Sequence, residues 1–165
     1  MRTWRSIAGL ALWRDTAGAA MVEFTLLAPF LLFLGLGVSE FGRFLYQYQL
    51  VLDGLRDGAR YLARAYDPGD TTDEATAKET KAINLAVTGT IDGTGTARVD
   101  DWAAADVTFN VTPVDNSDGS YRGGAFVYTV QASTTFDYVD VGFLDALGLP
   151  ALSITATHMQ RAIGE

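Results

Sequence analysis

The sequence contains no cysteine and only one histidine among its 165 residues. Without cysteine there can be no disulfide framework, no zinc ribbon and no thiol nucleophile. A single imidazole excludes sites built from several histidines and leaves at most one such group for acid–base chemistry. Basic residues are also scarce, because 12 Lys and Arg stand against 20 Asp and Glu. The net charge of −8 argues against a general nucleic-acid binder, whose affinity comes from clustered cations.

Charge is nearly absent from one long stretch close to the amino terminus. The only charged residue from Thr16 to Ser39 is Glu23, and the run from Phe24 to Ser39 has none. Counted from Ala17, the stretch has 23 positions, whereas a helix needs roughly 20 to cross the apolar core of a bilayer. Three arginines precede it, so we expect the amino terminus to stay in the cytoplasm and the bulk of the chain to lie on the other side.

Two other interpretations of this stretch fit less well. A secretory signal peptide has an apolar region of about 7–15 residues followed by a small-residue cleavage site. Here the small residues 17–20 precede the apolar run. A core helix of a soluble protein would show a polar stripe, and this run shows none. We therefore predict a retained transmembrane helix over residues 19–39, with a bend and not an end at Pro29, which frees the carbonyl of Thr25.

Glu23 is the one charge inside the predicted span, where a carboxylate is costly and needs a partner or a role. If the chain were cut after Gly18, the new α-ammonium group would belong to Ala19, one helical turn from this carboxylate. An ammonium group at a helix amino terminus is unfavourable with the macrodipole, so Glu23 could neutralise its own amine or that of a neighbouring copy. The alternative is a carboxylate at the membrane edge that lipid headgroups solvate.

The residues around this acid resemble a known export signal. Gly18-Ala-Ala-Met-Val-Glu23, followed by an apolar run, is similar to the class III signal of type IV pilin-like proteins, in which a basic leader is cut after Gly and Glu is the fifth mature residue. The wider string 18–30, together with Glu40-Phe-Gly-Arg43 and Arg56-Asp-Gly-Ala-Arg-Tyr61, closely resembles TadE-like proteins, the minor pilins or pseudopilins of the tight-adherence (Tad/Flp) pilus system. One departure is Phe24, because Flp-type pilins usually carry Tyr after the Glu.

This resemblance implies cleavage between Gly18 and Ala19 by a prepilin peptidase, which would change the net charge from −8 to −10. It also implies a structural or assembly component, a minor pilin or pseudopilin that acts through helix–helix assembly in surface adhesion and is not an enzyme. Its partners would be the bacterial inner membrane, other pilin-like subunits and the pilus assembly machinery, with no nucleic acid. A role in the shaft, at the tip or as an assembly factor stays open. The alternative is an uncleaved, membrane-anchored extracytoplasmic domain for binding or sensing.

Residues 40–66 continue a helical pattern beyond the predicted span. Apolar residues recur at steps of three and four and predict one buried face: Phe41, Phe44, Leu45, Tyr48, Leu52, Leu55, Ala59 and Leu62. The other face carries charge and predicts i,i+3 ion pairs, among them Asp53–Arg56 and Asp57–Arg60. Gly54 and Gly58 form a small-xxx-small pair that allows close backbone approach, either to another subunit or to the chain's own fold.

The remaining residues, 67–165, predict a small α+β domain. Asp67-Pro-Gly-Asp70 ends the long helix, and residues 72–87 read as a shorter one. Alternating patterns predict three strands, with apolar positions at Val107, Phe109 and Val111, at Phe126, Tyr128, Val130 and Ala132, and at Leu152, Ile154 and Ala156. A turn at 115–119 joins the first two, and a helical turn lies at 143–147. We therefore predict four parts: a leader (1–18), a transmembrane helix (19–39), its extension outside the membrane (40–66) and an extracytoplasmic α+β domain (67–165). The extension packs on the three-stranded antiparallel sheet of that domain, which resembles the arrangement of a pilin.

Candidate residues for catalysis or ligand binding are few. His158 shares the apolar face of the last strand, and we interpret it as a half-buried core side chain with satisfied hydrogen bonds. Acidic residues gather at 67–74 and at 115–118 and could offer oxygens to calcium, but neither set has the spacing of a defined loop, so solvated turns are the better interpretation. There is no phosphate-binding or dinucleotide-binding motif. We predict no cofactor and no metal.

Overall fold

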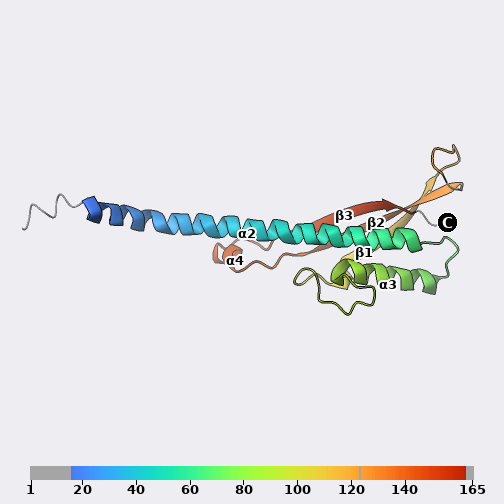
Figure 1. The fold of residues 1–165 in the computed structure, drawn as a ribbon, viewed down its shortest axis with the longest axis horizontal. Coiled ribbons are helices and arrows are strands. Elements are labelled where there is room, and N and C mark those ends of the chain that lie inside the picture. Colours follow the sequence, from blue (N-terminus) through green and yellow to red (C-terminus); the bar gives the residue numbers. More distant parts are fainter. Residues whose placement is uncertain (1–15, 123, 163–165) are drawn as a thin grey trace, which may run out of the picture. The chain divides into compact units, whose positions relative to one another are not determined.

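The structure is a computed structural model that describes residues 16–122 and 124–162 (Figure 1). Most of the predicted leader, residues 1–15, lies outside the described residues. The described elements are the helices α2 (Thr16–Ala65), α3 (Thr72–Thr88) and α4 (Phe143–Ala146), and the strands β1 (Val107–Asp115), β2 (Phe126–Asp137) and β3 (Ser153–Arg161). The chain divides into two compact units after Phe41, and α2 contributes residues to both.

Helix α3 forms where the sequence predicts it because both of its ends are capped. Thr71 accepts a hydrogen bond from the backbone N–H of Glu74 at 3.4 Å, and Glu74 accepts one from the backbone N–H of Thr71 at 3.0 Å. This reciprocal capping box satisfies donors that the first helical turn leaves open. These bonds, chiefly that from the Thr71 backbone, lower the pKa of the Glu74 carboxyl. Gly89, in the left-handed conformation with φ of 77°, ends the helix.

The three strands form one antiparallel sheet in the order β1-β2-β3, which confirms the predicted sheet. Val107 pairs with Thr134 across β1 and β2, and Phe136 pairs with Ile154 across β2 and β3. The second strand runs five residues beyond Ala132, the last apolar position predicted for it, since β3 continues the pairing to Asp137. One face of the sheet packs on α2 within residues 42–165, so the fold is α+β as predicted.

Two residues predicted on the buried face of the sheet are exposed. Phe126 retains 54% and Leu152 44% of its surface. Phe126 is the first residue of β2, and Leu152 directly precedes β3. The predicted apolar positions that are buried are Val107, Phe109, Val130, Ala132, Ile154 and Ala156. The predicted alternation holds at these positions, but a period-2 pattern does not show where the cover of a sheet stops.

The buried face of α2 is shifted by part of a turn from the predicted stripe. Its centre is Val51, Leu55 and Ala59, all fully buried, and the polar residue Gln47 is only 7% exposed. The predicted stripe residue Leu45 is 44% exposed. The shift arises because α3 as well as the sheet packs on this helix, which places Gly54 and Gly58 inside the buried face.

The largest fully buried side chain is Trp102, which the sequence does not place in the core because no periodic pattern surrounds it. Trp102 is 1% exposed and its Nε1 donates a hydrogen bond to Thr134 Oγ1 at 3.0 Å. Its ring stacks on Phe136 with centroids 6.0 Å apart. A buried indole needs a partner for its N–H, and the threonine on β2 supplies it.

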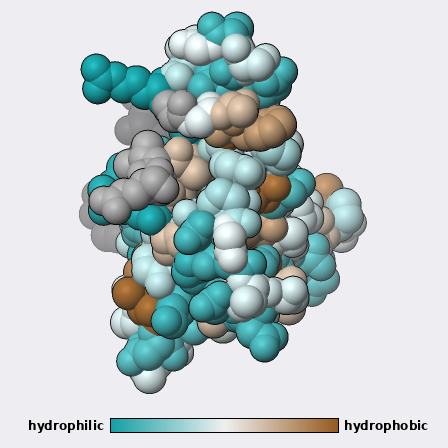
Figure 2. All heavy atoms as spheres, turned by 90° about the vertical axis from the view of Figure 1, so that its right-hand side faces the viewer, coloured by the Kyte–Doolittle hydropathy of each residue, from teal (hydrophilic) through white to brown (hydrophobic). Residues whose placement is uncertain are grey.

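Hydrophilic residues cover most of the end of the molecule that faces the viewer in Figure 2, where α2 stops and the β1–β2 hairpin turns. Hydrophobic residues appear there only as small separate spots. Scattered apolar residues of this kind are normal on a soluble surface. No extended apolar surface is seen on this face of the described residues.

Candidate assembly segment

The first part of α2 is apolar on all its sides. Its most hydrophobic 18-residue window has a mean hydropathy of 2.0, and none of that window is buried. Among the described residues this is one helix that is long and apolar enough to cross a membrane by length and composition. The exposed large side chains of this segment are Met21, Val22, Phe24, Leu26, Leu27, Phe30, Leu31, Leu32, Phe33, Leu34, Leu36 and Val38. A helix with no polar face is suited to lipid or to a bundle of similar helices.

Glu23 is an exposed residue of this segment and the one charged residue among described residues 16–39. It stands between the exposed Val22 and Phe24, so apolar side chains flank the carboxylate. Four residues separate it from Ala19, a rise of about 6 Å along a helix. Both residues belong to the continuous helix α2, so an amine at Ala19 would lie one turn before the carboxylate.

Pro29 lies inside α2 and does not end it, as the sequence predicts. Proline leaves the carbonyl four residues earlier, that of Thr25, without its helical donor. The Thr25 hydroxyl forms its own bond one turn further back, donating to the Met21 carbonyl at 2.8 Å. Such internal hydrogen bonds are what a hydroxyl needs where no water is present.

Gly54 and Gly58 lie where α2 meets α3. A Cβ added at Gly54 would stand 2.4 Å from the Ala86 carbonyl oxygen and 2.7 Å from the Trp102 ring. At Gly58 it would stand 2.7 Å from the Ala82 carbonyl oxygen. Gly54 faces Ala86, whereas Gly58, one turn later on α2, faces Ala82, one turn earlier on α3. The two helices therefore run antiparallel, as Figure 1 shows. Close packing inside the fold thus accounts for the spacing of this pair.

Comparison with known proteins bears on this same helix. The family model of TadE-like proteins matches residues 18–60. Over this segment the chain is similar to TadE-like proteins. The match begins at Gly18 and takes in Glu23, Pro29 and the glycine pair, and it stops before α3 and the sheet. No curated protein and no solved structure matched the chain. The family match suggests a component associated with the Tad pilus.

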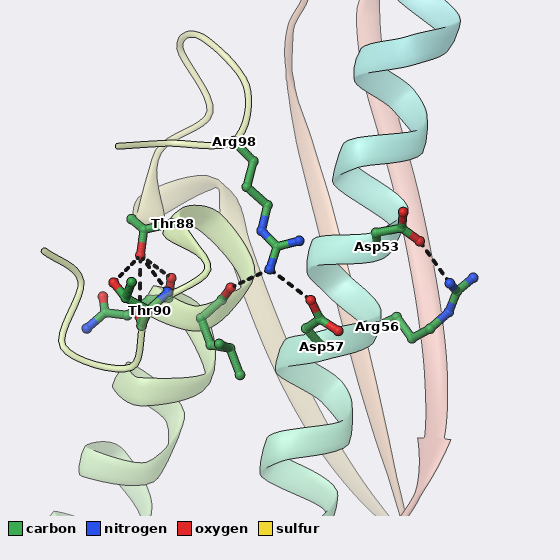
Figure 3. Close-up of polar contacts among 8 residues, drawn as sticks. Asp53, Arg56, Asp57, Thr88, Thr90 and Arg98 are labelled. Carbon is green, nitrogen blue, oxygen red and sulfur yellow. Dashed lines mark hydrogen bonds and ion pairs between the residues drawn. The ribbon is translucent and has the colours of Figure 1, made fainter. Parts of the chain in front are cut away.

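Two ion pairs join the TadE-like segment to the loop after α3: Arg98 with Asp57 (Figure 3), and Arg43 with Asp100, whose Nη2 and Oδ2 atoms are 3.8 Å apart. Arg98 Nη2 donates to Asp57 Oδ2 at 2.8 Å and also lies 3.4 Å from the Leu85 carbonyl oxygen. The predicted Asp57–Arg60 pair is therefore wrong, because a cation distant in sequence reaches Asp57. The predicted Asp53–Arg56 pair is confirmed at 2.8 Å. Arg98 thereby links the loop to both helices.

The acidic residues considered above as calcium ligands include three with local hydrogen-bond partners, Asp70, Asp115 and Asp118. Both carboxylate oxygens of Asp70 accept hydrogen bonds from Lys78 Nζ, at 2.7 and 2.6 Å, and this bonding raises the pKa of Lys78. Asp115 and Asp118 each bond the serine two residues later, and the bonds from Ser120 lower the pKa of Asp118. Within residues 16–122 and 124–162 no group of three or more His, Cys, Asp or Glu side chains could hold a metal ion.

His158 differs from its predicted state in one respect. It is half-buried, as expected, and pairs with Ala132 across β2 and β3. Its Nε2 is buried, and among the described residues no hydrogen-bond partner reaches it. The expectation of a fully satisfied histidine is therefore wrong for the part of the chain that the structure describes.

Proposed function

We propose that this chain is a structural or assembly component, a minor pilin or pseudopilin, of a Tad/Flp-type pilus. The observation that carries the proposal is the TadE-like match over residues 18–60, which begins at the residue where the export signal would be cut. A helix apolar on all sides, continuous with a folded carboxyl-terminal unit, suits a subunit that is stored in a membrane and assembled through its helix.

Processing would take place between Gly18 and Ala19, through a prepilin peptidase. Residues 1–18 would leave as the leader, residues 19–39 would span the inner membrane, and 40–165 would lie outside the cytoplasm. Three arginines leave with the leader, so the cations that hold the amino terminus in the cytoplasm are lost on cleavage. The mature chain would then be free to leave the membrane along its helix axis.

Glu23 would act as the charge partner of an α-ammonium group. A carboxylate within an apolar segment costs a few kcal/mol unless a partner or solvent compensates it. The amine created at Ala19 carries the opposite charge and lies one turn away along α2. When apolar helices bundle, a carboxylate facing the amine of the neighbouring copy fixes their axial register, because any slip separates the two charges in apolar surroundings.

The test is Glu23→Gln, which removes the charge and keeps the size of the side chain. The variant should reach the membrane at the wild-type level but fail to form pili. Glu79→Gln, a matched change on α3 far from the apolar segment, should assemble normally. Electron microscopy of sheared pili and immunoblots of membranes give the two readouts. Full piliation by Glu23→Gln would overturn the role proposed for this carboxylate.

A further inference from the structure

The loop 138–152, which contains α4, is held together by its own backbone hydrogen bonds and turns. The backbone N–H of Tyr138 donates to the Leu152 carbonyl at 2.7 Å and closes its base. Inside the loop, the backbone N–H of Leu144 donates to Asp140 Oδ2 at 2.6 Å. Gly142 and Gly148 turn the chain on either side of α4 with φ of 89° and 65°, conformations that favour glycine. The loop therefore holds its side chains in a defined arrangement.

That arrangement presents apolar side chains to the outside. The exposed fractions lie between 39% and 63% for Val139, Val141, Leu147, Leu149 and Leu152. Apolar side chains gathered within one short exposed loop are candidates for an interaction site. No lysine or arginine occurs from 137 to 152, whereas aspartate occurs three times. A partner for this surface must be apolar and must not carry excess negative charge.

The base of the loop contacts a residue that follows the apolar segment closely along the chain. The rings of Tyr138, at the base of the loop, and Phe44 meet edge to face with centroids 5.3 Å apart. Phe44 follows Ser39, the last residue of the apolar run, by five residues. Even a fully extended chain of five residues spans at most about 17 Å, and a helical one about 7.5 Å. Phe44, which the base of the loop contacts, therefore lies within that chain length of the residue where the predicted span ends.

We propose that the loop 138–152 inserts its apolar side chains into the outer surface of the bilayer that residues 19–39 span. This inference rests on the proposed membrane span. The absence of cations from the loop makes a zwitterionic lipid surface its partner, because an anionic surface would repel the loop aspartates. The loop forms a second membrane contact, which holds the carboxyl-terminal unit against the membrane before assembly.

The absence of cysteine allows a direct test by single-cysteine spin labelling of the full-length chain. Val139→Cys and Leu149→Cys report on the loop, and Leu32→Cys reports on the span. Val114→Cys is the matched control, because Val114 and Val139 are 41% and 39% exposed. Val114 pairs with Val127, and ten residue steps of β2, about 33 Å of strand, separate Val127 from Asp137. In Figure 1 the hairpin and α4 accordingly lie at opposite ends of the sheet.

The labelled chains are reconstituted at low density in phosphatidylcholine vesicles, and collisions with oxygen and with a water-soluble nickel complex are compared. Labels at 139, 149 and 32 should collide more often with oxygen, which dissolves in the bilayer, than with the nickel complex. The label at 114 should collide more often with the nickel complex. Replacing half of the phosphatidylcholine with the anionic lipid phosphatidylglycerol should reduce the oxygen preference of the label at 149 and leave that of the label at 32 unchanged. Nickel preference at 139 and 149 with oxygen preference at 32 would overturn the loop insertion alone. Nickel preference at 32 would overturn the proposed span and the insertion with it.

A second copy of the chain is the competing occupant of the loop surface. In that case labels at 149 would broaden one another's spectra, and dilution with unlabelled chain would remove the broadening. That result would overturn insertion into lipid. Sharp spectra that do not change on dilution, together with oxygen preference at 149, support it.

Discussion

Replacing Gly54 with alanine should destabilise the carboxyl-terminal unit although alanine is the better helix former. A new Cβ would stand 2.4 Å from the Ala86 carbonyl oxygen and 2.7 Å from the Trp102 ring, and neither neighbour is the end of a flexible side chain. Overpacking of a tight site costs roughly 1–3 kcal/mol, and the rigid neighbours here favour the upper end. The gain in helix propensity returns up to about 1 kcal/mol. The net loss should be about 2 kcal/mol.

The matched control is Gly42→Ala on the same helix, where a Cβ would meet nothing within 4 Å. That variant should be more stable than the wild type by up to about 1 kcal/mol. For a unit of this size each kcal/mol moves the melting temperature by roughly 4 °C. Melting followed by near-ultraviolet circular dichroism in detergent should therefore show a fall of about 8 °C for Gly54→Ala and a rise for Gly42→Ala. If Gly54→Ala were as stable as Gly42→Ala, the antiparallel contact of α2 and α3 would be refuted.

Three further outcomes are expected from the same melting assay. Trp102→Phe should lose about 2 kcal/mol, because it removes the hydrogen bond to the 3% exposed Thr134 and leaves that hydroxyl buried without it; an unchanged midpoint would contradict this. Asn116→Ala should lose about 2 kcal/mol, since the buried amide bonds backbone groups of Tyr121 and Gly124 across the hairpin loop, whereas exposed Asn110→Ala should lose little. The pKa of Glu74 is lowered in the fold, so its contribution is present above its ordinary value of 4.5 and is lost as the pH falls through the lowered value. The acid-induced fall in melting temperature should thus be smaller in Glu74→Gln than in the wild type, and equal falls would speak against the capping box.

The elements that sequence alone predicts are those whose signals are local. The capping residues Thr71 and Glu74 define the start of α3, and Pro68 with Gly69 stops α2. Alternation of apolar and polar residues identifies all three strands. Each of these signals lies within a few residues of the structure it determines.

Features that depend on distant residues escaped prediction. Asp57 pairs with Arg98, 41 positions away, in place of its helical neighbour Arg60. Trp102 belongs to the core because Thr134 and Phe136 on β2 receive it, and no periodic pattern surrounds it in the sequence. The phase of the buried face of α2 depends on α3, whose docking against Gly54 and Gly58 is likewise a long-range contact.

The residues proposed to act in assembly belong to a different class. Gly18 and Glu23 were found from a local string, and the TadE-like match covers both. The roles proposed for them concern cleavage and contacts with other copies, which a single chain does not display. The residues around them are exposed, as a segment destined for lipid or for neighbouring helices must be.

The amino terminus of the chain purified from membranes tests the central claim most directly. Intact-mass and amino-terminal peptide mass spectrometry should find a chain that begins at Ala19, with the three leader arginines gone and a positive amine one turn before Glu23. A chain that begins at Met1 or Arg2 and still spans the membrane would contradict the pilin proposal and favour an uncleaved, membrane-anchored domain for binding or sensing.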